Sequence, residues 1–143
     1  MLSPVSDMQL SVVPADHVGQ FWHLFEPLLA PVFDGKAGNG EVTLEQLRMM
    51  LGRGSQHLIS IENDGELIGA LTIQFINYPN KRIALGTAFG GRGITTQEVM
   101  DRVKVWCKGM GASEFRTYAK DAQARLYEKV GLSKRYNVVG VEL

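Results

Sequence analysis

Apolar residues along this chain fall into short alternating or continuous runs separated by glycine, proline and asparagine. Runs of strand type occupy Met8–Val13, His57–Glu62, Glu66–Asn77, Lys81–Phe89, Glu114–Ala119 and Tyr136–Val141. Apolar spacing of helical type occurs at 20–26, 43–51, 95–110 and 121–131. This order, β-α-α-β-β-β-α-β-α-β, predicts one α+β domain over residues 1–143, in which an antiparallel meander precedes a β-α-β unit. We expect a mixed, three-layer α/β/α arrangement around a mostly antiparallel sheet.

Local signals place several element boundaries. Thr43 followed by Gln46, and Thr95 followed by Glu98, are capping-box patterns that predict helix starts. Asp16 can cap the first helix, which Pro27 and Pro31 are expected to break or kink.

Two segments are predicted to lie between elements. Asn63-Asp64-Gly65 is a hairpin turn signal. Phe33–Glu41, with three glycines in nine residues, is the stretch expected to be most flexible.

Composition narrows the class of protein. The chain has 143 residues, 45% of them hydrophobic, and a formal net charge of zero, which argues against nucleic acid as a partner. One cysteine, Cys107, excludes an internal disulfide framework and fits a reducing compartment. No apolar run approaches the ~20 residues of a membrane span, and residues 1–7 do not resemble a signal peptide. We therefore expect a cytoplasmic protein with no membrane or nucleic-acid partner.

The segment from Asp121 to Leu132, DAQARLYEKVGL, carries the clearest family likeness. Asp121 is a suitable helix cap and Gly131 a suitable helix stop. The segment resembles the motif near the C-terminus of the GNAT superfamily of N-acetyltransferases, and the hairpin DGELIG at 64–69 is also typical of that family. The resemblance implies a sheet splayed in the middle, acetyl-CoA as co-substrate, and Tyr127 as the acid that protonates the departing thiolate.

A glycine-rich turn at Gly90–Gly93 precedes the predicted third helix, and such turns bind phosphate through backbone N–H groups. The family pattern has Arg or Gln at the position that Ala88 occupies, so Arg92 would supply the charge from another place in the loop. A tight turn without any ligand is the alternative. The resemblance makes the following residues candidates for binding coenzyme A: Ala88, Phe89, Gly90, Gly91, Arg92, Gly93, Ile94 and Arg125.

Transfer to an amine also benefits from a group that removes a proton. Residues 81–93 contain no Asp or Glu, so Glu62 on the preceding strand is the remaining candidate base, unless it is simply a solvated residue at a strand end. Tyr127 in turn can be a packed helix residue with no chemical role. His17, His23 and His57 lack metal-ligand spacing, so we expect no metal.

Two hypotheses of function follow. The first is an acyl-CoA-dependent N-acyltransferase that moves an acetyl group by direct attack to a small-molecule or protein amine. The second is a catalytically inactive GNAT-fold protein that serves as a structural or protein-binding component of a larger assembly. Under either hypothesis the chain can form a homodimer or join a larger assembly. Short divergent members of this kind resemble those encoded in phage genomes. A sensor that binds coenzyme A without turnover lies between the two.

Overall fold

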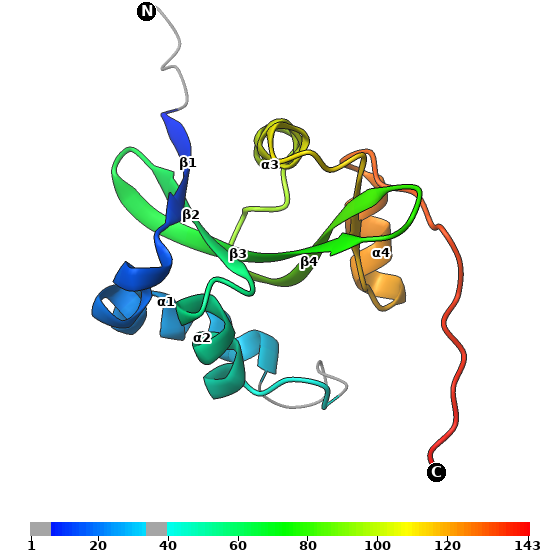
Figure 1. Cartoon of the computed structure of the whole chain (residues 1–143). Helices are drawn as coiled ribbons and strands as arrows, with labels where there is room; N and C mark the ends of the chain where they lie inside the picture. Colours follow the sequence, from blue (N-terminus) through cyan, green and yellow to red (C-terminus); the bar gives the residue numbers. More distant parts are fainter. Residues whose placement is uncertain (1–6, 34–39) are drawn as a thin grey trace, which may run out of the picture.

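A five-stranded sheet forms the centre of the computed structural model, which describes residues 7–33 and 40–143 (Figure 1). Its strands lie in sequence order: β1 (Met8–Val13), β2 (His57–Asn63), β3 (Glu66–Asn77), β4 (Arg82–Gly91) and β5 (Glu114–Thr117). Neighbouring strands are antiparallel except β5, which runs parallel to β4. The predicted α+β class and mostly antiparallel sheet are confirmed.

Helices cover both faces of this sheet (Figure 1). The helices α1 (Val18–Phe33) and α2 (Leu44–Gly52) pack on one face, and α3 (Gln97–Gly109) packs on the other. A short 3-10 turn, Ala15–His17, precedes α1, and α4 (Asp121–Glu128) lies beside the β4 and β5 end of the sheet. The result is the expected three-layer arrangement.

Each face of the sheet has its own core. Ile59, Ile61 and Ile73 join Val99 and Val103 of α3 on one side. On the other side Leu58, Ala70 and Ala88 contact buried residues of α1 and α2, which are Trp22, Phe25, Leu29, Leu47 and Leu51. The alternation of these side chains between faces follows the period of two along a strand.

The prolines of the first helix do not end it, contrary to expectation. The helix α1 continues through Pro27 and Pro31 to Phe33. Both prolines are exposed, and so is His23. Because proline has no N–H, the carbonyl four residues before it loses its helical partner, which affects the carbonyls of His23 and Pro27. These residues lie four apart and therefore on one side of the helix. Water can satisfy those carbonyls, while Trp22, Phe25 and Leu29 hold the helix on the sheet from its other side. Most of the segment predicted to be flexible, residues 34–39, lies outside the described residues.

Helix starts agree with local signals in part. The capping box of α2 is formed, with the Thr43 hydroxyl accepting from the Gln46 N–H at 3.1 Å and the Gln46 side chain accepting from the Thr43 N–H at 2.9 Å. In α3 the cap is Thr96 instead of Thr95, and it accepts from the Val99 N–H at 3.2 Å. Two adjacent threonines offer the same chemistry, so sequence did not distinguish them.

Two further residues at helix starts differ from their predicted roles, and in each case a nearby side chain gives the reason. Glu98 does not complete a box and pairs with Arg102 at 3.6 Å. The cap of α4 is Lys120, whose N–H donates to the Gln123 side chain at 3.1 Å, so Asp121 is the first helical residue.

The last predicted strand, Tyr136–Val141, is absent. Residues 132–143 form no strand or helix, and β5 ends at Thr117. Side chains of this segment face solvent, with Val139 91% and Val141 85% exposed. In Figure 1 the segment runs away from the sheet toward the C-terminus. A β-type sequence becomes a strand only when it pairs with another, and this one has no neighbour in the described chain.

Candidate functional site

The sheet opens between β4 and β5. These strands pair from Ile83 opposite Glu114 to Gly86 opposite Thr117, where β5 ends. β4 continues to Gly91. Its residues 88–91 pair with β3 on one side, Thr87 is left unpaired by an irregularity in that pairing, and no strand of the described chain lies on the other side. The Thr117 hydroxyl donates to the Gly86 carbonyl at 3.0 Å and marks the last point of contact. Backbone N–H and C=O groups of residues 87–91 that point toward β5 are therefore available to a ligand.

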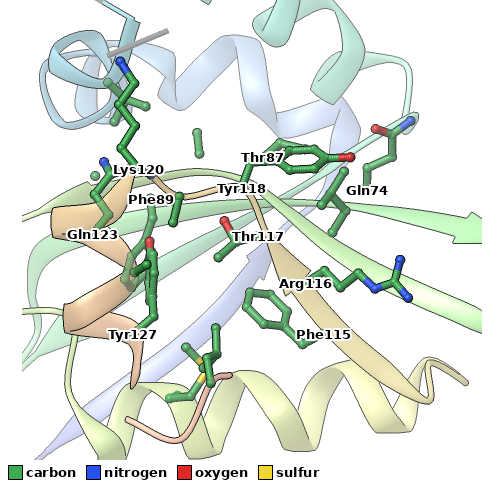
Figure 2. Close-up of a pocket in the computed structure, with 18 of the residues that line it drawn as sticks. Gln74, Thr87, Phe89, Phe115, Arg116, Thr117, Tyr118, Lys120, Gln123 and Tyr127 are labelled. Carbon is green, nitrogen blue, oxygen red and sulfur yellow. Dashed lines mark hydrogen bonds between the residues drawn. The ribbon is translucent and has the colours of Figure 1, made fainter. Parts of the chain in front are cut away.

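A long groove follows this opening. It is lined by Leu85 and residues 87–92 on β4 and its end, by Phe115 to Lys120 on and after β5, and by one face of α4. On the α1 and α2 side it also reaches Leu28, Val32, Leu47 and Gln56. Figure 2 shows Phe89, Thr117 and Tyr127 around the opening. The groove thus connects both faces of the sheet through the gap between two strands.

Tyr127 lies on the groove side of α4. Its ring is tilted against that of Phe89, with centroids 6.5 Å apart (Figure 2). Burial raises the pKa of the Tyr127 phenol above its usual value, so the hydroxyl stays protonated at neutral pH. The Tyr127 ring therefore lies next to the open part of β4.

Glycines at the end of β4 are required by packing. A Cβ on Gly90 would lie 2.1 Å from the Leu28 carbonyl oxygen of α1. One on Gly91, at φ +132°, would lie 2.4 Å from the Ile68 carbonyl oxygen of β3. Gly93 has open space around it but a φ of +65°, which favours glycine. The predicted glycine turn is therefore the end of a strand followed by a short loop.

The structure brings some of the candidate coenzyme-binding residues together. Ala88 to Arg92 line the groove, and Arg92 is exposed there. Gly93 and Ile94 do not line it, and the Ile94 side chain is 3% exposed in the core beneath α3.

Arg125 and Glu62 lie elsewhere. Arg125 is exposed on α4 and is not among the residues that line the groove. Glu62 sits on β2 opposite Gln9 of β1, on the far side of the sheet order from the β4–β5 opening. The structure does not bring either side chain to the groove.

A buried polar cluster at the groove floor was not identified from the sequence. The Thr87 hydroxyl lies 2.5 Å from Gln56 Oε1 and 2.7 Å from the Thr72 hydroxyl. Thr72 is 0% and Gln56 3% exposed, whereas Thr87 is half-buried and lines the groove. Thr72 and Thr87 each interrupt an apolar strand sequence, ALTIQ and LGTAF, and that interruption was the available signal.

A second polar cluster lies on β5. Glu114, whose side chain is 13% exposed, pairs with Arg116, with Arg135 at 3.2 Å and with Lys81 at 3.8 Å. Arg116 also donates to the Tyr136 hydroxyl at 3.1 Å. These contacts fix the start of the C-terminal segment to β5 and add positive charge beside the groove.

Two negative findings concern the described residues alone. Among residues 7–33 and 40–143, no group of three or more His, Cys, Asp or Glu side chains is arranged to hold a metal ion. Within those same ranges, every helix is too short or too polar to cross a membrane.

Comparison with known proteins gives matches at the level of structure. Neither a protein-family model nor a curated protein sequence matches this chain. An aminoglycoside acetyltransferase, meta-AAC0020 from an uncultured soil metagenomic sample, solved with trehalose, matches with a TM-score of 0.68 at 15% identity, over 95% of both chains.

Two further structures match over almost their whole length. The aminoglycoside N-acetyltransferase AAC(6')-Iy, solved with CoA, has a TM-score of 0.67 at 14% identity and covers 100% of this chain and 99% of its own. The ribosomal-protein-alanine N-acetyltransferase of Brucella melitensis biovar Abortus 2308 has a TM-score of 0.68 at 14% identity, over 95% of this chain and 99% of its own. Identities this low establish the architecture alone, and on that evidence the chain has the GNAT fold of N-acetyltransferases.

Proposed function

We propose that this protein transfers an acetyl group from acetyl-CoA to a primary amine. The observation that carries the proposal is the opening between β4 and β5, with Tyr127 beside it. An acetyltransferase of the same fold, AAC(6')-Iy, was solved in complex with CoA. The opening supplies what an extended amide-containing ligand needs, which is a length of unpaired strand backbone.

Residues around the opening fit such a ligand. The free backbone of residues 87–91 would hydrogen-bond the amides of the pantetheine arm. The exposed Arg92, and the N–H groups of the loop before α3, would hold the pyrophosphate. Packing alone already requires glycine at positions 90 and 91, so the proposal assigns the phosphate to Arg92 and the loop, and does not need the missing side chains of these two glycines for phosphate binding.

Chemistry at this site would be a direct attack. The amine nitrogen forms a bond to the thioester carbonyl carbon, the carbon–sulfur bond breaks, and the thiolate takes a proton from the Tyr127 hydroxyl. The nitrogen releases its extra proton to water, and Tyr127 regains one from solvent. The raised pKa of Tyr127 keeps the donor protonated before the bond breaks.

The alternative proposal is a GNAT-fold protein without turnover that binds another macromolecule. Two observations favour it. Residues 81–93 contain no carboxylate, and Glu62 and Arg125 lie outside the groove. An exposed apolar segment at residues 136–143 offers surface for a protein partner.

Calorimetric titration with acetyl-CoA separates the two. We expect binding by the wild type, and about threefold to tenfold weaker binding by Arg92→Gln, because an exposed charge–phosphate contact contributes modestly. Arg53→Gln, an exposed arginine at the end of α2 outside the groove, is the matched control and should bind as the wild type does. Absence of binding at millimolar acetyl-CoA would leave the non-enzymatic proposal.

A second experiment tests the acid. With a panel of primary amines, Tyr127→Phe should lower the release of free thiol by about 10²-fold while acetyl-CoA binding is retained. Unchanged turnover in Tyr127→Phe would remove Tyr127 from the chemistry, since the phenylalanine keeps the ring and its contact with Phe89.

A further inference from the structure

The cluster of Thr72, Thr87 and Gln56 lies next to the opening between β4 and β5. Thr87 is the first residue of β4 beyond the last pair with β5. It is also the extra residue of an irregularity in the β3–β4 register, where Thr72 pairs with Ala88 and Ile73 pairs with Gly86. Thr72 lies two residues from Ala70 and faces α1 and α2 as Ala70 does, so the cluster faces the helices opposite α3.

Hydrogen positions in this cluster follow from its acceptors. The Gln56 Nε2 donates to the Met50 sulfur at 3.6 Å, which leaves Gln56 Oε1 facing Thr87. Turning the amide over would set an oxygen against the sulfur with no hydrogen between them. Since an amide oxygen accepts and does not donate, the proton between Gln56 and Thr87 belongs to Thr87.

This arrangement leaves the Thr87 oxygen as an acceptor. Its own hydrogen points to Gln56 Oε1 at 2.5 Å, which is closer than the Thr72 carbonyl oxygen at 3.3 Å, so in the 2.7 Å contact between the two hydroxyls it is Thr72 that donates. A hydroxyl oxygen has two lone pairs, and Thr72 uses one of them. Thr87 is half-buried and lines the groove, so the second lone pair is within reach of a molecule bound there. Gln56 and Thr72, both buried, hold this orientation fixed.

We propose that Thr87 positions the acceptor amine, with its Oγ accepting a hydrogen bond from the attacking nitrogen; this rests on the proposed acetyltransferase function. A group that can only accept favours a ligand that donates, as the N–H of an amine does. The hydrogen bond aims the nitrogen toward the thioester at the β4–β5 opening. Thr87 takes no proton, in keeping with a strand that carries no carboxylate near it. The acceptor class is therefore an amine that enters from the α1 and α2 face.

Steady-state kinetics on Thr87→Val and Thr87→Ser test this. The probes are sisomicin, glucosamine 6-phosphate and an alanine tripeptide, with thiol release as the readout and calorimetry for acetyl-CoA binding. For the amine that the wild type acetylates best, we expect Thr87→Val to lower kcat/KM for the amine about tenfold and to leave acetyl-CoA binding unchanged. Thr87→Ser, which keeps the hydroxyl, should recover most of the loss.

Two further variants separate positioning from folding. Gln56→Met removes the acceptor of the Thr87 hydrogen while keeping a side chain of similar length at this position of the groove wall, and should raise KM for the amine. Ser60→Ala removes another buried hydroxyl, which donates to the Ser11 carbonyl at 3.3 Å outside the groove. This variant should have the kcat and the KM for the amine of the wild type.

Three outcomes would contradict the role of Thr87, and only the last of them would also contradict the proposed function. A wild type that binds acetyl-CoA and acetylates an amine, with equal kcat/KM in Thr87→Val, overturns the role of Thr87 and leaves the proposed function standing. Equal loss of acetyl-CoA binding and of amine turnover in Thr87→Val also overturns it. A wild type that binds no acetyl-CoA removes the proposed function, and the role of Thr87 with it.

Discussion

Replacing Gly90 by alanine should destabilise the protein through a clash between β4 and α1. The added Cβ would lie 2.1 Å from the Leu28 carbonyl oxygen and 2.9 Å from its carbon. Real Cβ contacts essentially never fall below 3.0 Å, so the helix or the strand must move by about 0.9 Å. Both partners are backbone, and no side-chain rotation relieves the contact.

The free-energy cost of the Gly90→Ala substitution can be estimated from the known cost of overpacking a protein core. Overpacking a core costs about 1–3 kcal/mol, and a contact between two backbones belongs at the upper end, at ~3 kcal/mol. With a urea m-value of about 2 kcal/mol/M, the unfolding midpoint should fall by about 1.5 M. The assay is equilibrium urea unfolding followed by circular dichroism and by tryptophan fluorescence, which reports on Trp22 of the same helix and on Trp106 of α3.

A matched control is available in α1 itself. A Cβ on Gly19 meets nothing within 4 Å among the described residues, so Gly19→Ala should stabilise the helix by about 0.5 kcal/mol. A Gly90→Ala midpoint within 0.3 M of the wild type would refute the reasoning. In that event α1 does not approach β4 this closely, and Gly90 needs another explanation, such as contact with a ligand.

Three further predictions concern buried and exposed groups. Burial raises the pKa of the Cys107 thiol to about 11, so Ellman's reagent at pH 8 should label it only after unfolding in guanidinium; rapid labelling of the native protein would contradict its burial. Burial, and to a smaller extent the charge of Arg82, lowers the pKa of His57 in the folded protein. The unfolded chain therefore takes up the His57 proton more readily, so the folded protein should lose stability as pH falls below the unfolded pKa of ~6.5. The drop in urea midpoint from pH 7.5 to 5.5 should be smaller in His57→Gln, and an equal drop would exclude this role. Val139 is 91% exposed, so Val139→Asp should change the unfolding free energy by less than ~0.5 kcal/mol. Leu29 is 0% exposed, and Leu29→Ala should lower it by about 2–5 kcal/mol. A large effect at Val139 would mean that the C-terminal segment packs against another part of the protein.

Some features that are set by neighbouring residues were predicted from the sequence. The capping box at Thr43 and Gln46 formed because its partners lie three residues apart. The turn at Asn63-Asp64-Gly65 joins β2 to β3, with Asp64 at φ +52° and Gly65 at φ +79°. Both are decided within one turn of chain, so sequence contains all the information they need.

Features set by distant residues were not. Whether α1 passes through Pro27 and Pro31 depends on which side of the helix meets the sheet. Whether residues 136–141 form a strand depends on a pairing partner that their own sequence does not contain. In the candidate site, Tyr127 was found from a local motif, whereas the contact of Thr87 with Gln56 joins residues 31 positions apart.

The opening between β4 and β5 has a consequence for hydrogen exchange. Amide hydrogens of residues 88–91 that point toward β3 belong to a ladder, whereas those that point the other way meet no strand of the described chain. The second set should exchange with solvent deuterium fast, in the middle of an otherwise protected strand. Any ligand that lies along this backbone would slow them while the β3-facing amides stay as they were. Exchange at alternate residues of one strand would therefore register occupancy without any chemical turnover.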